Sequence, residues 1–548
     1  MNFKENETAQ KLAGAYYTPK NIAAFLANWV ADIQPNKVLE PSCGDGAFME
    51  ALSSLCSMSS STKVSAIDID PVALASVREK SSRGQFGQLK VECVQQDFLT
   101  FSQGAIETGT RFDAVMGNPP FIRYQYLDAE HQAATEEIFR DAGLKFTKHT
   151  NAWVPFVVQS IRLLRSGGRL GMVIPSELMH VIHAGSLRSF LRKECENVAV
   201  VHLEELFSSE VLQGVVLLLA TKAGKSDMKC ADIAFPSAKS GDLVNGCASA
   251  FQNNLPYISS IDLGEKWMEG LLTPDELKVY SKAQKLSQVF RFTELAKAEV
   301  GIVTGANKFF LVPDATVTEY GLHEFSKPMF GRSSHVKGVV IAKENLVENA
   351  RAGLPTNFLH FPKISKDQFP LNVRRYIESG EKDELHKRFK CRIREPWYVV
   401  PSVWAAEVAM LKRAHDTPRI ILNDARAYTT DTAYRITIKD PKVVSAQCLV
   451  ASFVNSLTAL SAELEGRHYG GGVIELVPSE IKRLVIPVST NSLDTLSELD
   501  GMYRKGIKAT EIMRQRDAII LSEVGLTQEE QDTLHIAWKR LKNRRQRN

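Results

Sequence analysis

The sequence has eight cysteines among 548 residues, but no two are spaced as CxxC and none has a histidine nearby at ligand spacing. Zinc sites and disulfide frameworks depend on such spacings, so we expect neither, and we expect reduced, buried thiols. No stretch approaches the roughly 20 apolar residues that a membrane helix needs, and the first ten residues are polar. These absences predict a cytoplasmic protein without a metal site or a membrane partner.

Charge of one sign is not in excess either. Lys plus Arg total 67 and Asp plus Glu total 63, so the formal net charge is +4. Nucleic-acid binding therefore cannot be argued from net charge, and a basic surface would have to be local. The clearest basic run, Lys539–Arg547 (KRLKNRRQR), is more typical of a solvated helix end than of a binding tail.

The first part of the chain alternates short apolar runs with amphipathic stretches. Buried strands separated by helices predict an α/β fold with a mostly parallel, doubly wound sheet. The predicted strands are Lys37–Glu40, Val64–Asp68, Leu89–Gln95, Asp113–Gly117, Leu170–Ile174, Val198–Leu203 and Val215–Thr221. The predicted helices are Pro19–Val30 with Thr18 as its cap, Ala47–Cys56, Pro71–Glu79, Val154–Leu164 and Ser186–Cys195.

The regular alternation of apolar runs and amphipathic stretches ends after Lys222. A chain of 548 residues is also too long for one ordinary hydrophobic core. We expect residues 1–222 to form the α/β domain. Residues 223–260, rich in Gly, Ser, Ala and Lys, suit a crossing segment. Residues 261–548 are expected to form a mixed α+β domain with a helical tail over Leu493–Arg547.

Residues suited to a nucleotide-like ligand follow the first three predicted strands. The first strand ends at Glu40, and its loop Ser42–Gly46 (SCGDG) has glycines that let backbone approach a ligand closely. The second ends at Asp68-Ile69 and the third at Asp97-Phe98, each an acid beside an apolar wall. Any one acid is more often a turn or cap residue. Three at successive strand ends predict a ligand at the carboxyl edge of the sheet.

The fourth predicted strand is followed by Asn118-Pro119-Pro120-Phe121. The prolines fix the backbone and remove two amide donors, which leaves carbonyls as acceptors. An amine held by the Asn118 side-chain oxygen and the Pro119 carbonyl would present its lone pair to an electrophilic methyl group, while Phe121 offers a face for a planar base. An ordinary turn is the less probable interpretation, given the loops upstream.

Together these motifs resemble the gamma group of amino-methylating DNA methyltransferases, of the TaqI type. Gly14–Pro19 (GAYYTP) resembles the N-terminal cofactor motif whose place ahead of the glycine loop defines that group. Leu206–Ser208 resembles the segment whose aromatic residue stacks on the second face of an extruded base. The resemblance implies a seven-stranded, Rossmann-like methyltransferase sheet and transfer of a methyl group from S-adenosylmethionine to the N6 amine of adenine.

The resemblance also implies a role for each site residue. Thr18 would hold the methionine carboxylate of the cofactor, Asp68 its ribose and Asp97 its adenine amine, while Phe121 and Phe207 would clamp the flipped base. The implied cofactor-binding residues are Tyr17, Thr18, Glu40, Ser42, Gly44, Gly46, Asp68, Ile69, Asp97, Phe98 and Asn118. The implied catalytic residues are Asn118, Pro119, Pro120 and Phe121.

The long C-terminal part resembles the target-recognition domains of type II methylases. The segments that carry this resemblance are Gly301–Val312, Arg394–Pro401, Pro418–Tyr428 and Gly466–Pro478. Arginines interleaved with aromatic and amide residues suit phosphate contacts and base readout, although any single one is more often a surface ion pair. These arginines are Arg332, Arg394, Arg419, Arg426 and Arg467. The polar segment Ile122–Thr150 is expected to be a loop, either mobile or closing on DNA.

Double-stranded DNA is therefore the expected partner of a monomeric enzyme, alongside a separate cognate restriction endonuclease that forms no stable complex with it. We expect no fused nuclease. The sequence leaves open an RNA adenine methyltransferase, a DNA cytosine-N4 methyltransferase and an inactive specificity module that binds cofactor and DNA. It does not reveal the recognition sequence.

Overall fold

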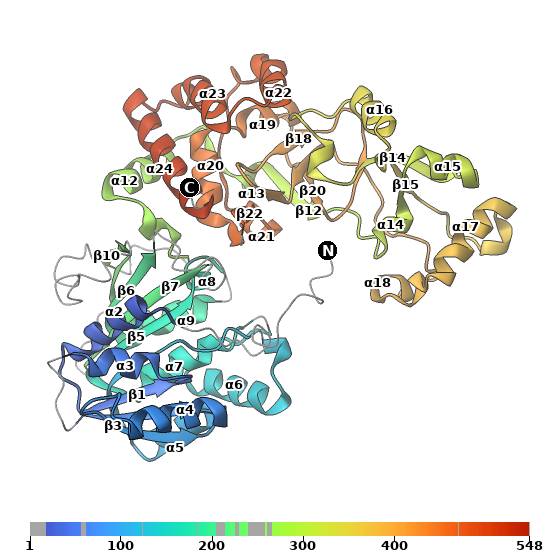
Figure 1. Ribbon diagram of the computed structural model, residues 1–548. Helices are drawn as coiled ribbons and strands as arrows, with labels where there is room; N and C mark the ends of the chain where they lie inside the picture. The colour runs from blue at the N-terminus through green and yellow to red at the C-terminus, as the bar shows by residue number, and fades with distance from the viewer. Residues whose placement is uncertain are drawn as a thin grey trace. The chain divides into compact units, whose positions relative to one another are not determined.

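The computed structural model describes residues 18–55, 62–122, 124–148, 150–181, 184–203, 214–224, 230–238, 258–259, 266–469 and 471–546. The chain divides into two compact units, Met1–Leu271 and Leu272–Asn548. Figure 1 colours them from blue to green and from green to red along the chain. Within the described ranges, the search for a helix long and apolar enough to cross a bilayer finds none.

One sheet organises the first unit, and all seven strands predicted from the sequence lie in it. They are β1 (Lys37–Pro41), β2 (Lys63–Asp68), β3 (Lys90–Gln95), β4 (Phe112–Gly117), β5 (Leu164–Pro175), β6 (Cys195–Leu203) and β7 (Val215–Lys222). Their order is 3-2-1-4-5-7-6, with β7 antiparallel to both of its neighbours. The predicted α/β class and doubly wound sheet are confirmed.

Helices cover both faces of this sheet (Figure 1). On one face, α2 (Lys20–Ala31), α3 (Ala47–Ser53) and α4 (Pro71–Ser82) contribute to a core with inward residues of β1, β2 and β4. The other helices of the unit pack on one another and include α5 (Phe98–Glu107), α6 (Ala129–Asp141), α7 (Trp153–Leu163) and α9 (Gly185–Glu194). Burying both faces explains why the strands read as nearly continuous apolar runs rather than as alternating ones.

The structure differs from the sequence predictions at four places in this unit. The sheet continues past β6 through three short strands within the segment expected to be a crossing, β8 (Asp232–Ala234), β9 (Ser237–Ala238) and β10 (Ile258–Ser259). β5 begins at Leu164, earlier than predicted. Thr18 does not cap α2, whose N-cap residue is Pro19. Much of the expected loop Ile122–Thr150 is helix α6, because Asp128 caps its first turn and Ile138 and Phe139 are buried.

The second unit is mixed α+β, as predicted, and its described strands form small, largely antiparallel sheets. One sheet is built from β12 (Ala296–Val300), β20 (Ala433–Ile438), β16 (Val408–Leu411) and β18 (Ile420–Leu422). Another is built from β13 (Leu311–Val312), β15 (Asn357–Leu359), β14 (Ser326–Phe330) and β19 (Tyr428–Thr429). The smallest ones join β17 (Arg413–Ala414), β22 (Val473–Glu475) and β21 (Arg467–Tyr469), and pair β11 (Val289–Arg291) with β23 (Val485–Pro487).

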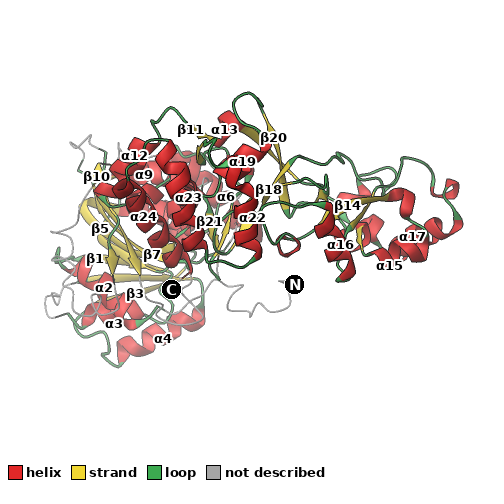
Figure 2. Cartoon of the chain, turned by 90° about the horizontal axis from the view of Figure 1, so that it is seen from above, coloured by secondary structure: helices red, strands yellow, loops and turns green. Residues whose placement is uncertain are grey.

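Two groups of helices accompany these sheets. Those near the described end of the chain are α19 (Ala446–Ser452), α20 (Ser456–Glu465), α21 (Pro478–Ile481), α22 (Leu496–Arg504), α23 (Ala509–Glu523) and α24 (Gln528–Gln546). The earlier ones are α12 (Pro274–Ala283), α13 (Phe292–Leu295), α14 (Asn307–Phe310), α15 (Asp314–Tyr320), α16 (Lys343–Arg351), α17 (Leu371–Lys382) and α18 (Phe389–Arg392). Helix α24 packs against α20, α23 and α12, and we call these four helices the helical layer. Figure 2 shows α23 and α24 together in it.

The basic run at the end of the chain is a solvated helix end only in part: among its described residues, Lys539, Arg540 and Arg544 are exposed, whereas Lys542 and Arg545 are buried. Arg545 is buried and forms a bidentate pair with buried Glu463 of α20, with N–O distances of 2.8 and 2.9 Å. Its guanidinium also donates to the His415 carbonyl at 2.8 Å. Lys542 pairs with Asp416 at 3.0 Å. These charges hold the helical layer together internally.

Candidate active site

The loop after β1 lies at the carboxyl edge of the sheet, and three of its residues have left-handed backbone conformations. Ser42, Gly44 and Gly46 have φ values of 56°, 53° and 86°. At Gly46 a Cβ atom would come within 3.1 Å of the Phe86 ring and 3.2 Å of Met49, so glycine is needed for the loop to sit on the core. At Gly44 a Cβ atom would meet nothing within 4 Å. The Gly44 backbone therefore faces open space, as a close approach to a ligand requires.

Asp68, at the end of β2, ties this loop to the next one. Its Oδ2 accepts from the Gly44 N–H at 2.8 Å and its Oδ1 accepts from the Asp70 N–H at 2.9 Å. Each carboxylate oxygen has a further lone pair, so these bonds orient the group without saturating it. Ile69 beside it is 63% exposed. It offers an apolar wall at this edge.

Glu40 is completely buried at the end of β1, and neither carboxylate oxygen has a hydrogen-bond partner within the described part of the chain. Burial raises its pKa well above the ordinary value, and the charges of Asp45 and Asp68 raise it further. A buried, unpartnered carboxyl group costs free energy unless a cationic ligand compensates it. S-adenosylmethionine carries a sulfonium and an ammonium group, so this acidic cluster fits the implied cofactor.

We predict opposite effects of Glu40→Gln on stability and on ligand binding. Because the folded pKa is raised, the folded protein holds a proton that the unfolded chain releases, and wild-type stability falls as pH rises above about 4.3. The Glu40→Gln protein is expected not to lose stability in this way, and its melting temperature at pH 8 should be about 2–4 °C higher than that of wild type. Its affinity for S-adenosylmethionine is expected to fall at least about tenfold.

Thermal melts between pH 5 and 8 and titration calorimetry with the cofactor measure the two effects. Glu92→Gln makes the same chemical change at an exposed position of β3 and is the matched control. A Glu40→Gln protein that is less stable than wild type at pH 8, or that binds the cofactor as tightly, would contradict this account of Glu40.

The motif after β4 is joined to both neighbouring motifs. The Asn118 Nδ2 donates to the Thr18 Oγ1 at 3.3 Å, across 100 residues of sequence. The Ser42 hydroxyl contacts the Asn118 carbonyl oxygen at 3.3 Å. Pro119 is buried, while Pro120 and Phe121 are half-buried. The structure thus brings Thr18, the glycine loop and the Asn118–Phe121 motif to one point of the sheet edge.

The residues after β3 are placed differently from the expectation. Asp97 caps α5, since its Oδ1 accepts from the Thr100 N–H at 2.9 Å, and its Oδ2 lies 3.3 Å from the His131 Nε2. Phe98 is 2% exposed and packs against Phe156 with ring centroids 4.8 Å apart. In this structure Phe98 therefore supports the core and shows no exposed face to a ligand.

His131 was missed in the sequence, because its segment was interpreted as a loop. Its Nδ1 lies 2.7 Å from the Asp128 carboxylate. Burial lowers the pKa of His131, but the hydrogen bond to Asp128 and the charge of Asp97 outweigh burial, and the net shift is upward. The only sequence signal was Asp128 three residues before His131, a spacing typical of a helix cap.

We predict that His131→Gln destabilises the protein only at low pH. The raised folded pKa means that the stabilisation is fully present below about pH 6.5 and is lost as pH rises through the folded value. The side chains are partly exposed, so the loss at pH 6 should stay below about 1 kcal/mol. Urea unfolding at pH 6 and pH 9 measures it, with exposed His323→Gln as control. An equal loss at both pH values would contradict this pairing.

Two of the predicted site residues, Tyr17 and Phe207, lie outside the described residues. No cluster of three or more His, Cys, Asp or Glu suited to a metal ion occurs in the part of the chain that the structure describes.

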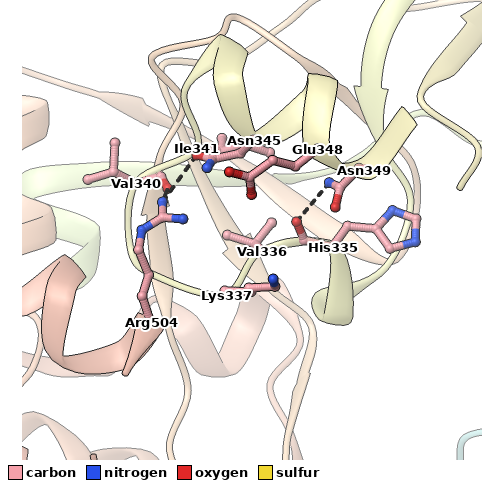
Figure 3. Close-up of a pocket in the computed structure, with 9 residues that line it drawn as sticks. All are labelled: His335, Val336, Lys337, Val340, Ile341, Asn345, Glu348, Asn349 and Arg504. Atoms are coloured by element: carbon pink, nitrogen blue, oxygen red, sulfur yellow. Dashed lines mark hydrogen bonds between the residues drawn. The ribbon is translucent and has the colours of Figure 1, made fainter. Parts of the chain in front are cut away.

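A small pocket of the second unit does not compete with this site. It is lined by residues of α16, α22 and the segment before α16, and its cavity volume is about 10 Å³, room for about one water. Figure 3 shows it closed by Arg504, which donates to the Val340 carbonyl at 2.9 Å, and by Asn349, which donates to the His335 carbonyl at 3.0 Å. It is too small for a nucleotide or a nucleobase.

The arginines expected to contact DNA divide into two classes. Three of them are used inside the second unit. Arg394 donates to the Val303 and Thr304 carbonyls, Arg419 donates to the carbonyls of Val336, Lys337 and Gly338, and Arg467 pairs with buried Glu480. Arg332 and Arg426 are exposed, and Arg426 has a positive φ of 49° in a loop held by buried Asn423.

Comparison with known proteins adds to this geometry. Residues 2–252 match the family model of N-6 DNA methylases, and residues 264–521 match that of the C-terminal domain of type II methyltransferase M.Eco57I. Type II methyltransferase M.AccI of Acinetobacter calcoaceticus is 23% identical over 515 residues, 90% of this chain and 89% of M.AccI. Type II methyltransferase M.XamI of Xanthomonas campestris pv. amaranthicola is 23% identical over 495 residues, 87% and 86% of the two chains.

Among solved structures, the Type IIL restriction-modification enzyme MmeI in complex with DNA has a TM-score of 0.58. It is 10% identical in sequence, and the match covers 95% of this chain and 75% of that one. At this identity the likeness concerns the fold, and it extends over both units.

Proposed function

We infer that this chain is a type II DNA adenine-N6 methyltransferase, since it carries an N-6 DNA methylase domain followed by a C-terminal domain of the M.Eco57I kind. The activity predicted from the sequence is thereby confirmed at this level, and the RNA, cytosine-N4 and inactive alternatives are not favoured. Assignment to the gamma group stays a prediction. It rests on Thr18 lying ahead of the glycine loop in sequence and beside Asn118 in space.

The observation that carries the proposed mechanism is the position of Asn118–Phe121 at the carboxyl end of β4, in contact with Thr18 and Ser42. S-adenosylmethionine, when bound, supplies an electrophilic methyl group. The Asn118 side-chain oxygen and the Pro119 carbonyl accept the two hydrogens of the adenine amine and hold its lone pair toward that group. Phe121 stacks on the flipped base. Positioning and hydrogen-bond polarisation account for the rate, so no general base is required.

Methyltransferases of this family depend on S-adenosylmethionine in general, and we propose that its site here is the edge formed by Thr18, Glu40, Ser42–Gly46 and Asp68. Exposed Ile69 supports an apolar wall there, and buried Glu40 supports a cationic ligand. Asp97 has lone pairs for an adenine amine although it also caps α5. Tyr17, Phe98 and Phe207 keep their predicted roles as proposals with no support in the described contacts.

Duplex DNA is the proposed substrate, because the named relatives are type II methyltransferases and MmeI was solved with DNA. A separate restriction endonuclease, a monomeric enzyme and a cytoplasmic location stay predictions. The domain limits 1–222, 223–260 and 261–548 are kept as a proposal beside the structural division after Leu271.

Transfer of a labelled methyl group from S-adenosylmethionine tests the proposal. Mixed-sequence duplex DNA and structured RNA are offered separately, and the methylated nucleosides are identified after digestion. We expect N6-methyladenine from DNA. N4-methylcytosine, methylated RNA alone, or cofactor binding without transfer would overturn it in favour of the corresponding alternative.

A further inference from the structure

A short basic segment of the second unit, Lys387–Arg394 (KRFKCRIR), has features that the proposed activity has not yet used; we call it the basic turn. Five of its eight residues are basic and none is acidic. Lys387, Arg388, Lys390 and Arg392 are exposed. Lys387 pairs with Glu384 at 2.5 Å, whereas no ion pair is recorded for the other three within the described residues. The turn therefore concentrates uncompensated positive charge.

The basic turn is anchored firmly. The Cys391 side chain is fully buried, and its Sγ lies 3.8 Å from the Thr304 carbonyl oxygen. Arg394 donates to the Thr304 carbonyl at 2.7 Å and to the Val303 carbonyl at 2.6 Å. Gly305 has a φ of 79°, and a Cβ atom there would lie 2.8 Å from the Lys390 Cβ. Residues of the motif Gly301–Val312 thus hold the basic turn in place through these contacts. The basic turn lies around α18 in Figure 1.

Two large apolar side chains are exposed among these cations. Phe389 is 62% exposed and Ile393 is 63% exposed. The Lys390 Nζ and the Arg392 Cζ each lie 5.5 Å from the centroid of the Phe389 ring. Exposed apolar residues rimmed by charge mark interaction surfaces. Cations around an aromatic ring suit a partner that has phosphates beside flat, apolar rings.

We propose that the basic turn is a contact surface for the backbone of duplex DNA, an inference that rests on the proposed function. Arg388, Lys390 and Arg392 bind phosphates, and Phe389 with Ile393 packs against sugars and base edges in a groove. Arg394 positions the turn. Charge complementarity favours DNA as the partner, because no acid lies between the exposed cations of the basic turn. Since the chain as a whole is nearly neutral, this positive charge is local to the turn.

The test compares wild type with the triple variant R388A/K390A/R392A. Binding of a fluorescein-labelled 30-base-pair duplex of mixed sequence is followed by anisotropy between 50 and 200 mM KCl. Loss of three phosphate contacts should reduce the slope of log affinity against log salt by about 2.7 and weaken binding at least about tenfold at 100 mM. Phe389→Ala should weaken binding with the slope unchanged, because no charge is removed.

The matched control is K442A/K482A/K505A, which removes three exposed lysines elsewhere in the same unit. We expect it to change affinity less than about threefold. Unchanged melting temperature and cofactor affinity establish that the basic-turn variant is folded. A basic-turn variant that behaves like the control would overturn the proposal. So would tighter wild-type binding to an RNA hairpin, or to vesicles containing anionic lipid, that is lost in the variant.

Methyl transfer by wild type, measured on the same preparations, separates the two claims. If the wild-type enzyme methylates DNA and the triple variant binds DNA normally, the proposed role of the basic turn is wrong and the proposed activity stands. If the wild-type protein transfers no methyl group, but its DNA binding is lost in the triple variant, the proposed activity is wrong and the basic turn still contacts DNA.

Discussion

Asn118→Ala should lower the rate of methyl transfer by about 10²–10³-fold or more, the effect of removing one pre-positioned hydrogen-bond group from a reacting centre. Asn118 lies at the tip of β4, where its side chain donates to Thr18 and its backbone carbonyl accepts from Ser42 of the loop after β1. Its loss removes an acceptor for the adenine amine. Cofactor affinity should change less than about fivefold, because the substitution leaves Glu40, Ser42–Gly46 and Asp68, which we propose hold the cofactor, unchanged.

Single-turnover transfer with labelled cofactor and titration calorimetry measure these two quantities. Asn36→Ala is a matched control, since Asn36 is exposed and immediately precedes β1, at the opposite edge of the sheet. We expect Asn36→Ala to transfer at the wild-type rate. An Asn118→Ala protein with wild-type turnover would contradict the assignment of the catalytic motif.

Arg545→Met is expected to destabilise the second unit by about 3 kcal/mol or more, the cost of leaving one member of a buried ion pair. Arg545 and its partner Glu463 are both fully buried. Burial raises the pKa of Glu463 while the guanidinium of Arg545 and the charge of Lys542 lower it, so removing Arg545 takes away the hydrogen-bonded cation that offsets burial. Urea unfolding followed by tryptophan fluorescence measures the loss.

Two further variants define what the Arg545→Met result means. Arg514→Met removes an exposed pair with Asp532 and should cost less than about 1 kcal/mol. Glu463→Leu combined with Arg545→Met removes both buried charges and should recover most of the stability. If Arg545→Met unfolds at the same urea concentration as Arg514→Met, the end of α24 does not hold the helical layer together.

Much of the catalytic unit could be predicted because its signals are local. Most of the seven strands are apolar runs bounded by turn residues, and the site residues lie at or directly after the carboxyl ends of β1, β2, β3 and β4. Parallel strands place such residues at one edge whatever the rest of the chain does. Asn118 and the loop after β1 accordingly meet, with the Ser42 hydroxyl 3.3 Å from the Asn118 carbonyl oxygen.

What could not be predicted depends on partners distant in sequence or on burial that composition does not reveal. Arg545 is buried because Glu463 lies 82 residues earlier in a helix packed against it. The segment holding His131 looked polar enough for a loop, yet Ile138 and Phe139 bury one face of α6. The packing of Phe98 against Phe156, far along the chain, has no local signal in the sequence either.

The second unit was the least predictable part. Its short sheets join strands separated by more than 100 residues, such as β12 and β20, and such pairing has no local signature. The arginines chosen from sequence were mostly those that the fold uses internally, Arg394, Arg419 and Arg467. The exposed cations of the basic turn have no distinguishing signal in the sequence, because their placement depends on the burial of Cys391.

The most direct test of the central claim is sequencing of genomic DNA for modified bases after expression in a host that lacks DNA methylation. The account predicts N6-methyladenine within a defined sequence context when the wild-type protein is expressed, and none when Asn118→Ala is expressed at the same level. DNA without modified adenines, or DNA equally modified by both proteins, would contradict it.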